Sequence, residues 1–237
     1  MVQSDPSTGA GPRSPIKRQA LELLRARNVR IETVLDVGVE RGTPELIEAF
    51  PDQMHILFEP VAEFAPFIER AYKDVAYRLL EVAVSDHSGT GVLQIDKITG
   101  NDVTHSALVE TANKEANQRQ IQTTTLDDAV ALMDLAKPYL LKIDIDGQEL
   151  RALAGASNVL SDCAIVIIEV PVYELSARLR ALEAVGFRLF DMVEPCYYDG
   201  SFWQADAIFI RNEVHAQHFS SLSNSGFEPA KYEMFKG

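Results

Sequence analysis

The sequence predicts a single α/β domain built on a mostly parallel sheet with helices on both faces. Seven short runs rich in β-branched and aromatic residues alternate with runs of helical periodicity, and several of the strand runs are apolar almost throughout. Such strands are typical of a parallel sheet that crossover helices cover on each face. The 237 residues, of which 46% are hydrophobic, suffice for one sizeable core. No long linker divides them, so one domain is expected.

The expected elements alternate along the chain. An amphipathic helix runs from Ile16 to about Arg27. The strand runs are TVLDVG, HILFEP, YRLLEVAVSD, YLLKIDID, CAIVIIEV, FRLFDMV and ADAIFIRN. Helices fit between them at PELIEAF, VAEFAPFIERAYK, LDDAVALMDL, GQELRALAGASNVL and YELSARLRALEAV. The stretch SGTGVLQIDKITGNDVTHSAL predicts an extra hairpin and an exposed loop over the sheet edge.

The two ends of the chain differ from its centre. Residues 1–15 are rich in Ser, Pro and Gly and are expected to be a disordered leader. Residues 16–211 form the predicted domain. In the tail, 212–237, no sustained period is found, which leaves two alternatives: packing against a second copy in a homodimer, or a mobile end.

Charge and hydropathy exclude several functional classes. The chain has 35 Asp and Glu against 22 Lys and Arg, a net charge of −13, which repels phosphate backbones and anionic membranes. Neither a nucleic acid nor a membrane is therefore an expected partner. No apolar run approaches the roughly 20 residues that span a bilayer, and the N-terminal segment lacks the apolar core of a signal peptide. We expect a cytoplasmic protein.

The stretch VLDVGVERGT is a strand followed by glycines and a helix start, as in nucleotide-binding folds. Its glycines, Gly38 and Gly42, are spaced G-x-x-x-G and lack the fingerprint that holds a pyrophosphate. Asp36 would repel a dianion and favours a ligand with a positive end, such as the amino-acid moiety of S-adenosylmethionine (SAM). The alternative is ordinary turn chemistry after a buried strand.

Further candidate ligands follow the next two strands. Glu59, in FEP, stands about twenty residues after the first corner, where a carboxylate can accept both hydroxyls of a ribose. In EVAVSD, Glu81 and Ala83 lie near the same edge, where an acceptor and a small residue could flank an adenine.

The fourth strand carries the densest polar cluster, KIDIDGQEL. Asp144 and Asp146 are expected on one face of the strand. Asp146 and Glu149 match a capping box at the next helix. Asp144 lies inside the apolar run, where a carboxylate is costly unless paired, so it is the best candidate for a functional acid.

Two residues are candidates for a general base, a side chain that could take a proton from a ligand hydroxyl. These are Asp144 and His105, the latter in a loop expected to overhang the carboxyl edge of the sheet. A Mg²⁺ site built from Asp144, Asp146 and Glu169 is a further hypothesis, because hard cations favour carboxylate oxygens.

Taken together, LDVGVERG, FEP, AVSDHSG, TTLDD, LLKIDIDGQELRALAGA and IIEV resemble, in this order, the FkbM-type family of SAM-dependent methyltransferases. The resemblance implies a seven-stranded Rossmann-like class I methyltransferase sheet with an antiparallel last strand. It also implies methyl transfer to a hydroxyl, commonly on a sugar or a polyketide-like natural product. By position it assigns the methionine end to Asp36, Gly38 and Gly42, the ribose to Glu59, the adenine to Glu81 and Ala83, and the region of the methyl group to Asp144.

The chain departs from the family pattern in three places. Gly38, Val39 and Glu40 replace the usual GAN, the usual DVEG is DIDG, and Glu81 stands where Asn is usual. The first departure, in the cofactor loop, leaves a competing interpretation: a non-catalytic module that binds SAM or a nucleoside. The acceptor is expected to be set by loops, among them EPCYYDGSFWQAD, whose aromatic residues suit stacking on a sugar face or an apolar ring, or ordinary packing.

Overall fold

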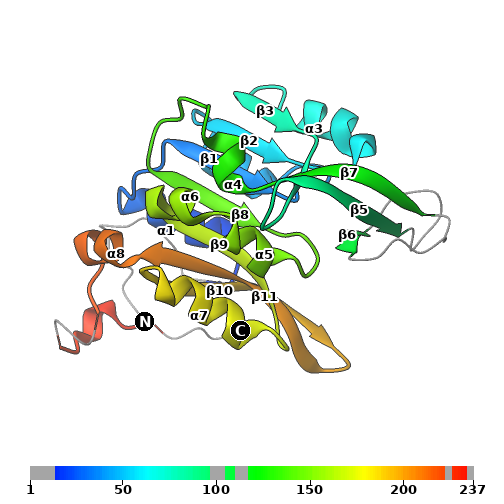
Figure 1. Ribbon diagram of the computed structural model, residues 1–237. Helices are drawn as coiled ribbons and strands as arrows, with labels where there is room; N and C mark the ends of the chain where they lie inside the picture. The colour runs from blue at the N-terminus through cyan, green and yellow to red at the C-terminus, as the bar shows by residue number, and fades with distance from the viewer. Residues whose placement is uncertain (1–13, 97–104, 110–116, 222–225, 234–237) are drawn as a thin grey trace.

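The computed structural model describes residues 14–96, 105–109, 117–221 and 226–233 (Figure 1). Its main sheet has seven strands, in the spatial order β10-β11-β9-β8-β1-β2-β3. Neighbouring strands from β9 to β3 are parallel, whereas β11 is antiparallel to both β9 and β10. The predicted mostly parallel sheet with an antiparallel last strand is thus confirmed. The bounds are β1 (Thr33–Val37), β2 (Met54–Phe58), β3 (Tyr77–Leu80), β8 (Tyr139–Ile143), β9 (Cys163–Pro171), β10 (Phe187–Tyr198) and β11 (Ser201–Arg211).

Helices cover both faces of this sheet, as predicted. Successive side chains of a strand point to opposite faces, so Val34 packs in the cluster that contains α1 and α2, while Leu35 packs with α5, α6 and α7. Figure 1 looks onto the second of these faces. The first face carries α1 (Lys17–Ala26), α2 (Pro44–Ala49), η1 (Ala62–Phe64) and α3 (Ala65–Ala71), and the second carries α4 (Leu126–Val130), α5 (Glu149–Ala154), α6 (Ser157–Asp162) and α7 (Leu175–Ala184).

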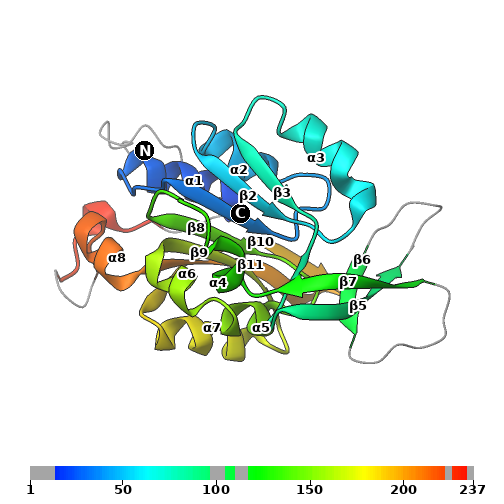
Figure 2. The same ribbon diagram turned by 45° about the horizontal axis from the view of Figure 1, so that its top comes forward.

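A second, four-stranded sheet in the order β4-β7-β5-β6 projects beside the main sheet (Figure 2). It contains the expected hairpin, because β5 and β6 are antiparallel. Two expectations need correction here. His105 was expected in a loop but is the first residue of β6, and the run YRLLEVAVSD is divided between the two sheets as β3 and β4. The bounds are β4 (Ala83–Val84), β5 (Gly89–Asp96), β6 (His105–Val109) and β7 (Gln118–Thr124).

The ends of the chain are partly described. Residues 1–13 of the expected leader lie outside the described ranges, and the backbone oxygen of Pro15 accepts a hydrogen bond of 2.8 Å from the Glu194 amide. The tail, for which no regular period was found, forms the helix α8 (Asn212–His218) and the turn η2 (Pro229–Lys231). Phe219, directly after α8, lies edge-on to Phe190 at 5.1 Å between ring centroids and joins the core. No helix in the described ranges is long and apolar enough to cross a membrane.

Candidate functional site

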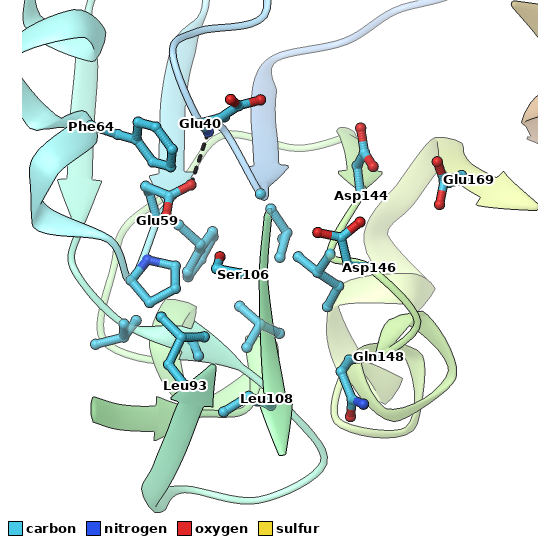
Figure 3. Close-up of a pocket in the computed structure, with 18 of the residues that line it drawn as sticks. Glu40, Glu59, Phe64, Leu93, Ser106, Leu108, Asp144, Asp146, Gln148 and Glu169 are labelled. Carbon is cyan, nitrogen blue, oxygen red and sulfur yellow. Dashed lines mark hydrogen bonds between the residues drawn. The ribbon is translucent and has the colours of Figure 1, made fainter. Parts of the chain in front are cut away.

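A cavity of about 310 Å³ opens at the carboxyl ends of β1, β2, β8 and β9, beside the second sheet (Figure 3). Its apolar wall includes side chains from the ends of β1 and β2 and from β4, β5 and β6. The charged residues that line it, among those the structure describes, are all acidic: Glu40, Glu59, Asp144, Asp146 and Glu169. Such a cavity attracts a ligand that carries positive charge and repels a phosphate.

Gly38 forms the corner between β1 and the cavity. Its φ is +81°, and a Cβ atom built on it would lie 1.8 Å from the backbone oxygen of Asp144. The exits of β1 and β8 therefore touch each other, and a residue without a side chain is required between them. The same contact brings a bare stretch of backbone to the cavity wall.

Glu59 lies at the end of β2 and is only 4% exposed. Its Oε2 accepts a hydrogen bond of 2.8 Å from the Glu40 amide, and its Oε1 accepts one of 2.9 Å from the Val61 amide. Burial raises the pKa of this carboxyl, while the two amides favour its ionised form. A carboxylate has about four acceptor positions, so about two remain for a pair of ligand hydroxyls.

Asp36 and Gly42, both assigned to the methionine end of the cofactor, do not line the cavity. Asp36 is fully buried, and its Oδ2 accepts hydrogen bonds from the hydroxyls of Thr43 (2.7 Å) and Tyr72 (3.2 Å). Gly42 has a φ of +120°, and a Cβ atom there would lie 2.8 Å from the Cβ of Ala71. Both residues fix the shape of the β1–α2 corner from behind, because their surroundings are core side chains.

Of the two residues assigned to the adenine, one lines the cavity and the other does not. Ala83 lines the cavity, but Glu81 is exposed in the link between β3 and β4 and is not part of the wall. Gln148 is a lining residue that the sequence did not reveal. Its Oε1 is buried without a hydrogen-bond donor in the described part of the chain, so it can accept a hydrogen bond from a ligand amino group.

Asp144 was expected inside a strand, but β8 ends at Ile143 and the Asp144 side chain is 41% exposed. Lys142 Nζ lies 3.1 Å from Asp144 Oδ2 and 3.6 Å from Asp36 Oδ1. The Lys142 charge lowers the pKa of Asp144. Burial alone would lower the pKa of Lys142, but the charges of Asp144 and Asp36 raise it above its ordinary value. Asp144 is therefore held as an anion in an ion pair.

The expected capping box of Asp146 and Glu149 is wrong. Helix α5 begins at Glu149 itself, with Gln148 at the N-cap and no side-chain cap. Glu149 Oε1 accepts hydrogen bonds from two backbone amides of the preceding turn, at 3.1 and 3.3 Å, and its Oε2 lies 2.6 Å from Arg178 Nη2. Both charged side chains are fully buried. Glu149 thus holds the turn that presents Asp146, whose φ is +52°, to the cavity.

Glu169, at the end of β9, lines the cavity and accepts a hydrogen bond from the side-chain amide of Gln204 on β11. Burial raises its pKa to about 7, and nearby carboxylates add to the shift. The sequence offered Glu169 only as a metal ligand. Its pairing with Gln204 depends on the antiparallel register of β9 and β11, which no local pattern reveals.

The two remaining hypotheses concern His105 and a metal. The side chain of His105 lies outside the described part of the structure, whereas Ser106 beside it lines the cavity.

Within the described residues no group of three or more His, Cys, Asp or Glu side chains is arranged to hold a metal ion. Asp144 instead pairs with Lys142, and Glu169 with Gln204. The carboxylates therefore do not fit the proposed Mg²⁺ site.

A protein-family model, the methyltransferase FkbM domain, matches residues 36–189, which include the β1 corner, Glu59 and the Asp144 to Glu169 edge of the cavity. The chain belongs to this family. It is therefore a SAM-dependent methyltransferase. A comparison with curated proteins finds no match.

Solved structures similar to this FkbM protein are methyltransferases of low sequence identity. An rRNA methylase from Streptococcus thermophilus has 12% identity and a TM-score of 0.49, over 85% of this chain and 99% of that one. A precorrin-6y C5,15-methyltransferase from Geobacter metallireducens has 9% and 0.44, over 85% and 93%. A ribosomal protein L11 methylase from Lactobacillus delbrueckii subsp. bulgaricus has 15% and 0.44, over 81% and 78%.

The cavity suits the SAM that the FkbM family implies. The backbone at Gly38 carries no side chain that would keep a ligand away. The Glu59 carboxylate has about two unused acceptor positions, and the buried Gln148 Oε1 has no hydrogen-bond donor in the described part of the chain. The acidic lining complements the sulfonium and ammonium charges of SAM. Gly38 and Glu59 would place the nucleoside at the β1–β2 side of the cavity, whereas Gln148 lies on the α5 side.

The departures of this chain from the FkbM pattern preserve the corner. Val39, in place of the usual Ala, is 2% exposed and packs in the core with α3. Glu40, in place of Asn, adopts a φ of +52° and donates its amide to Glu59. Its side chain is exposed and does not enter the core.

Proposed function

We propose that this methyltransferase transfers the methyl group of SAM to a hydroxyl of a small molecule, either a sugar or a natural-product intermediate. One observation carries the proposal: the cavity has two chemically different ends (Figure 3). Gly38 and Glu59 form an end suited to the nucleoside. Glu169 lies at the other end, with Asp144 between the two, and these carboxylates can accept the hydrogen bond of a hydroxyl.

Charge narrows the class of acceptor. Every charged residue described in the lining is acidic, so a phosphorylated or nucleotide-activated acceptor would be repelled, and a neutral or cationic one is favoured. Nucleic acid is disfavoured for the same reason.

Aromatic side chains on the β10–β11 hairpin support a ring-bearing acceptor. Tyr197, Tyr198 and Trp203 are 66%, 77% and 43% exposed, and Trp203 precedes the lining residue Gln204. Tyr173 and Trp203 approach within 5.8 Å between ring centroids. Aromatic surfaces of this kind stack on the apolar face of a sugar or on a flat ring.

The reaction needs alignment more than strong chemical activation. When bound, SAM supplies an electrophilic methyl group on a sulfonium. The protein holds the acceptor oxygen in line with that group and excludes water, which can account for several kcal/mol of the barrier. The apolar wall, including Phe64, Leu93 and Leu108, performs the second task. An alcohol also has to lose its proton, for which a general base contributes about 10²–10⁴ in rate.

The test has two stages. Calorimetry first measures SAM binding, and no binding at millimolar SAM would overturn the proposal. The protein and SAM are then incubated with small-molecule extracts of the source, and mass spectrometry searches for products that gain CH₂. Tandem spectra locate the new methyl group. Methylation on oxygen of a sugar-like or polyketide-like compound is expected, whereas methylation only on nitrogen, carbon or a macromolecule would refute the O-methyl assignment.

A further inference from the structure

We propose that Glu169 is the general base that accepts the proton of the acceptor hydroxyl, and that Gln204 is the positioning residue that orients its carboxylate. This inference rests on the proposed O-methyl transfer and names a residue for its proton step. It replaces both bases expected from the sequence, Asp144 and His105.

Glu169 lies in the cavity where an acceptor hydroxyl could reach it. Figure 3 shows Glu59 and Phe64 on one side of the cavity, Glu169 on the opposite side, and Asp144 and Asp146 between them. If the nucleoside occupies the Glu59 side, the methyl group points away from it, toward the Glu169 side. An acceptor hydroxyl placed there has Glu169 as a neighbour.

Three of the four other lining carboxylates, Glu40, Glu59 and Asp144, are less available than Glu169 as a base. Glu59 already accepts two backbone amides. Asp144 would have to give up its 3.1 Å ion pair with Lys142 to take a proton. Glu40 lies beside Glu59, because its backbone amide donates a hydrogen bond to the Glu59 carboxylate. Within the described residues Glu169 has a neutral side-chain partner, the amide of Gln204, and makes no ion pair.

The electrostatic surroundings of Glu169 also favour its role as a base. Four carboxylates act on it electrostatically: Asp144 at the end of β8, Asp146 in the turn, Glu149 on α5 and Asp206 on β11. Burial and these charges raise the pKa of Glu169 to about 7. A base with a pKa near the working pH combines a large ionised fraction with a strong tendency to take a proton.

The cations nearby belong to those other carboxylates. Lys142 pairs with Asp144, Arg178 with Glu149 at 2.6 Å, and Lys17 with Asp206 at 2.6 Å. Arg178 also donates a hydrogen bond of 2.6 Å to the backbone oxygen of Glu169, which fixes the end of β9 without neutralising the side chain. The arrangement therefore keeps the carboxylate of Glu169 in place and strongly basic.

The proposed step transfers one methyl group and one proton. The acceptor oxygen forms a bond to the methyl carbon while the carbon–sulfur bond breaks, and the electron pair of that bond remains on sulfur as a neutral thioether. The hydroxyl proton passes to an Oε atom of Glu169. Water takes this proton after product release and restores the carboxylate.

The experiment compares the wild type with Glu169→Gln, Glu169→Asp and Gln204→Met, and uses Glu183→Gln, an exposed position on α7, as the charge-matched control. The probe is the hydroxyl compound found to gain CH₂. For Glu169→Gln we expect kcat to fall about 10²–10⁴-fold, with SAM affinity by calorimetry within about threefold. The wild-type kcat should rise with pH through about 7, and this limb should be absent from the variant.

Gln204→Met tests positioning. Loss of a donor to the ionised carboxylate raises the pKa of Glu169, so the rising limb of kcat should move to higher pH, which a merely structural role would not produce. If Glu169→Gln retains wild-type turnover, or if its kcat still rises with pH through about 7, the assignment of Glu169 as the base is refuted. The proposed function would stand in that case. A wild type that binds SAM but methylates no hydroxyl compound would refute the proposed function and this inference together.

Discussion

Replacement of Arg178 by Met should strongly destabilise the protein, because it leaves a buried charge without its partner. Arg178 and Glu149 are both fully buried, and Arg178 Nη2 lies 2.6 Å from Glu149 Oε2. No hydrogen-bond donor among the described residues reaches that oxygen apart from this ion pair. Methionine fills a similar volume but offers no charge, so Glu149 must either remain as an isolated anion or take up a proton.

The loss of the partner of Glu149 determines how far the free energy of unfolding should fall. Removal of one partner from a buried ion pair costs about 3–5 kcal/mol, a large part of the roughly 5–15 kcal/mol by which domains are stable. For a chain of this size it corresponds to a fall in Tm of roughly 6–20 °C. Arg178 lowers the pKa of Glu149 against the effect of burial. Without Arg178 that pKa rises further, so the deficit should be larger at about pH 8 than at about pH 5, where protonation removes the isolated charge.

Urea unfolding followed by circular dichroism at both pH values measures the change. Arg180→Met, at an exposed position of the same helix, is the control and should shift stability by less than about 0.5 kcal/mol. The double variant Glu149→Met with Arg178→Met should show a favourable coupling of at least about 1 kcal/mol. A cost below about 1 kcal/mol for Arg178→Met, or the same deficit at both pH values, would contradict this account of the pair.

Three further predictions concern the cavity. Gly38→Ala should cost at least about 2 kcal/mol and weaken SAM binding, because its Cβ would lie 1.8 Å from the Asp144 oxygen; urea unfolding and calorimetry measure both effects. Glu59→Gln should weaken SAM binding about tenfold to a few hundredfold while Glu81→Gln, at an exposed position, leaves it unchanged; equal calorimetric effects would contradict the site. Because the folded pKa of Glu169 is raised, this residue should lower wild-type stability by on the order of 1–3 kcal/mol as pH rises from about 4.5 through about 7, and urea titrations of Glu169→Gln should show a correspondingly smaller slope.

The sheet could be predicted from the sequence because each of its strands is marked by a pattern of neighbouring residues. Val34 and Leu35 illustrate this: the central strand runs are apolar on both sides, and each side packs against its own layer of helices. Glu59 was also accessible to sequence reasoning, since a residue at the end of a parallel strand has only one edge of the sheet to face.

The roles of the buried charges could not be predicted in the same way, because they depend on partners from other elements. The sequence alone indicates no structural role for Asp36. The structure shows one, because the hydroxyls of Thr43 and Tyr72 donate hydrogen bonds to its carboxylate. The pairing of Glu149 with Arg178 joins α5 to α7, and no local pattern connects them. Lys142 is the exception. It lies two residues from Asp144, and alternate residues of a strand share a face, so the ion pair could have been inferred from KID.

The cavity draws its wall from Val37, near the start of the domain, to Gln204, near its end. These segments lie together only when the whole domain is folded, so the cavity that would hold SAM depends on the fold of the entire domain. Occupancy of the site at a hundred times Kd would add about 2.7 kcal/mol to the free energy of unfolding of the entire domain. Resistance of the chain to proteolysis would rise with it, because proteases cleave the transiently opened chain.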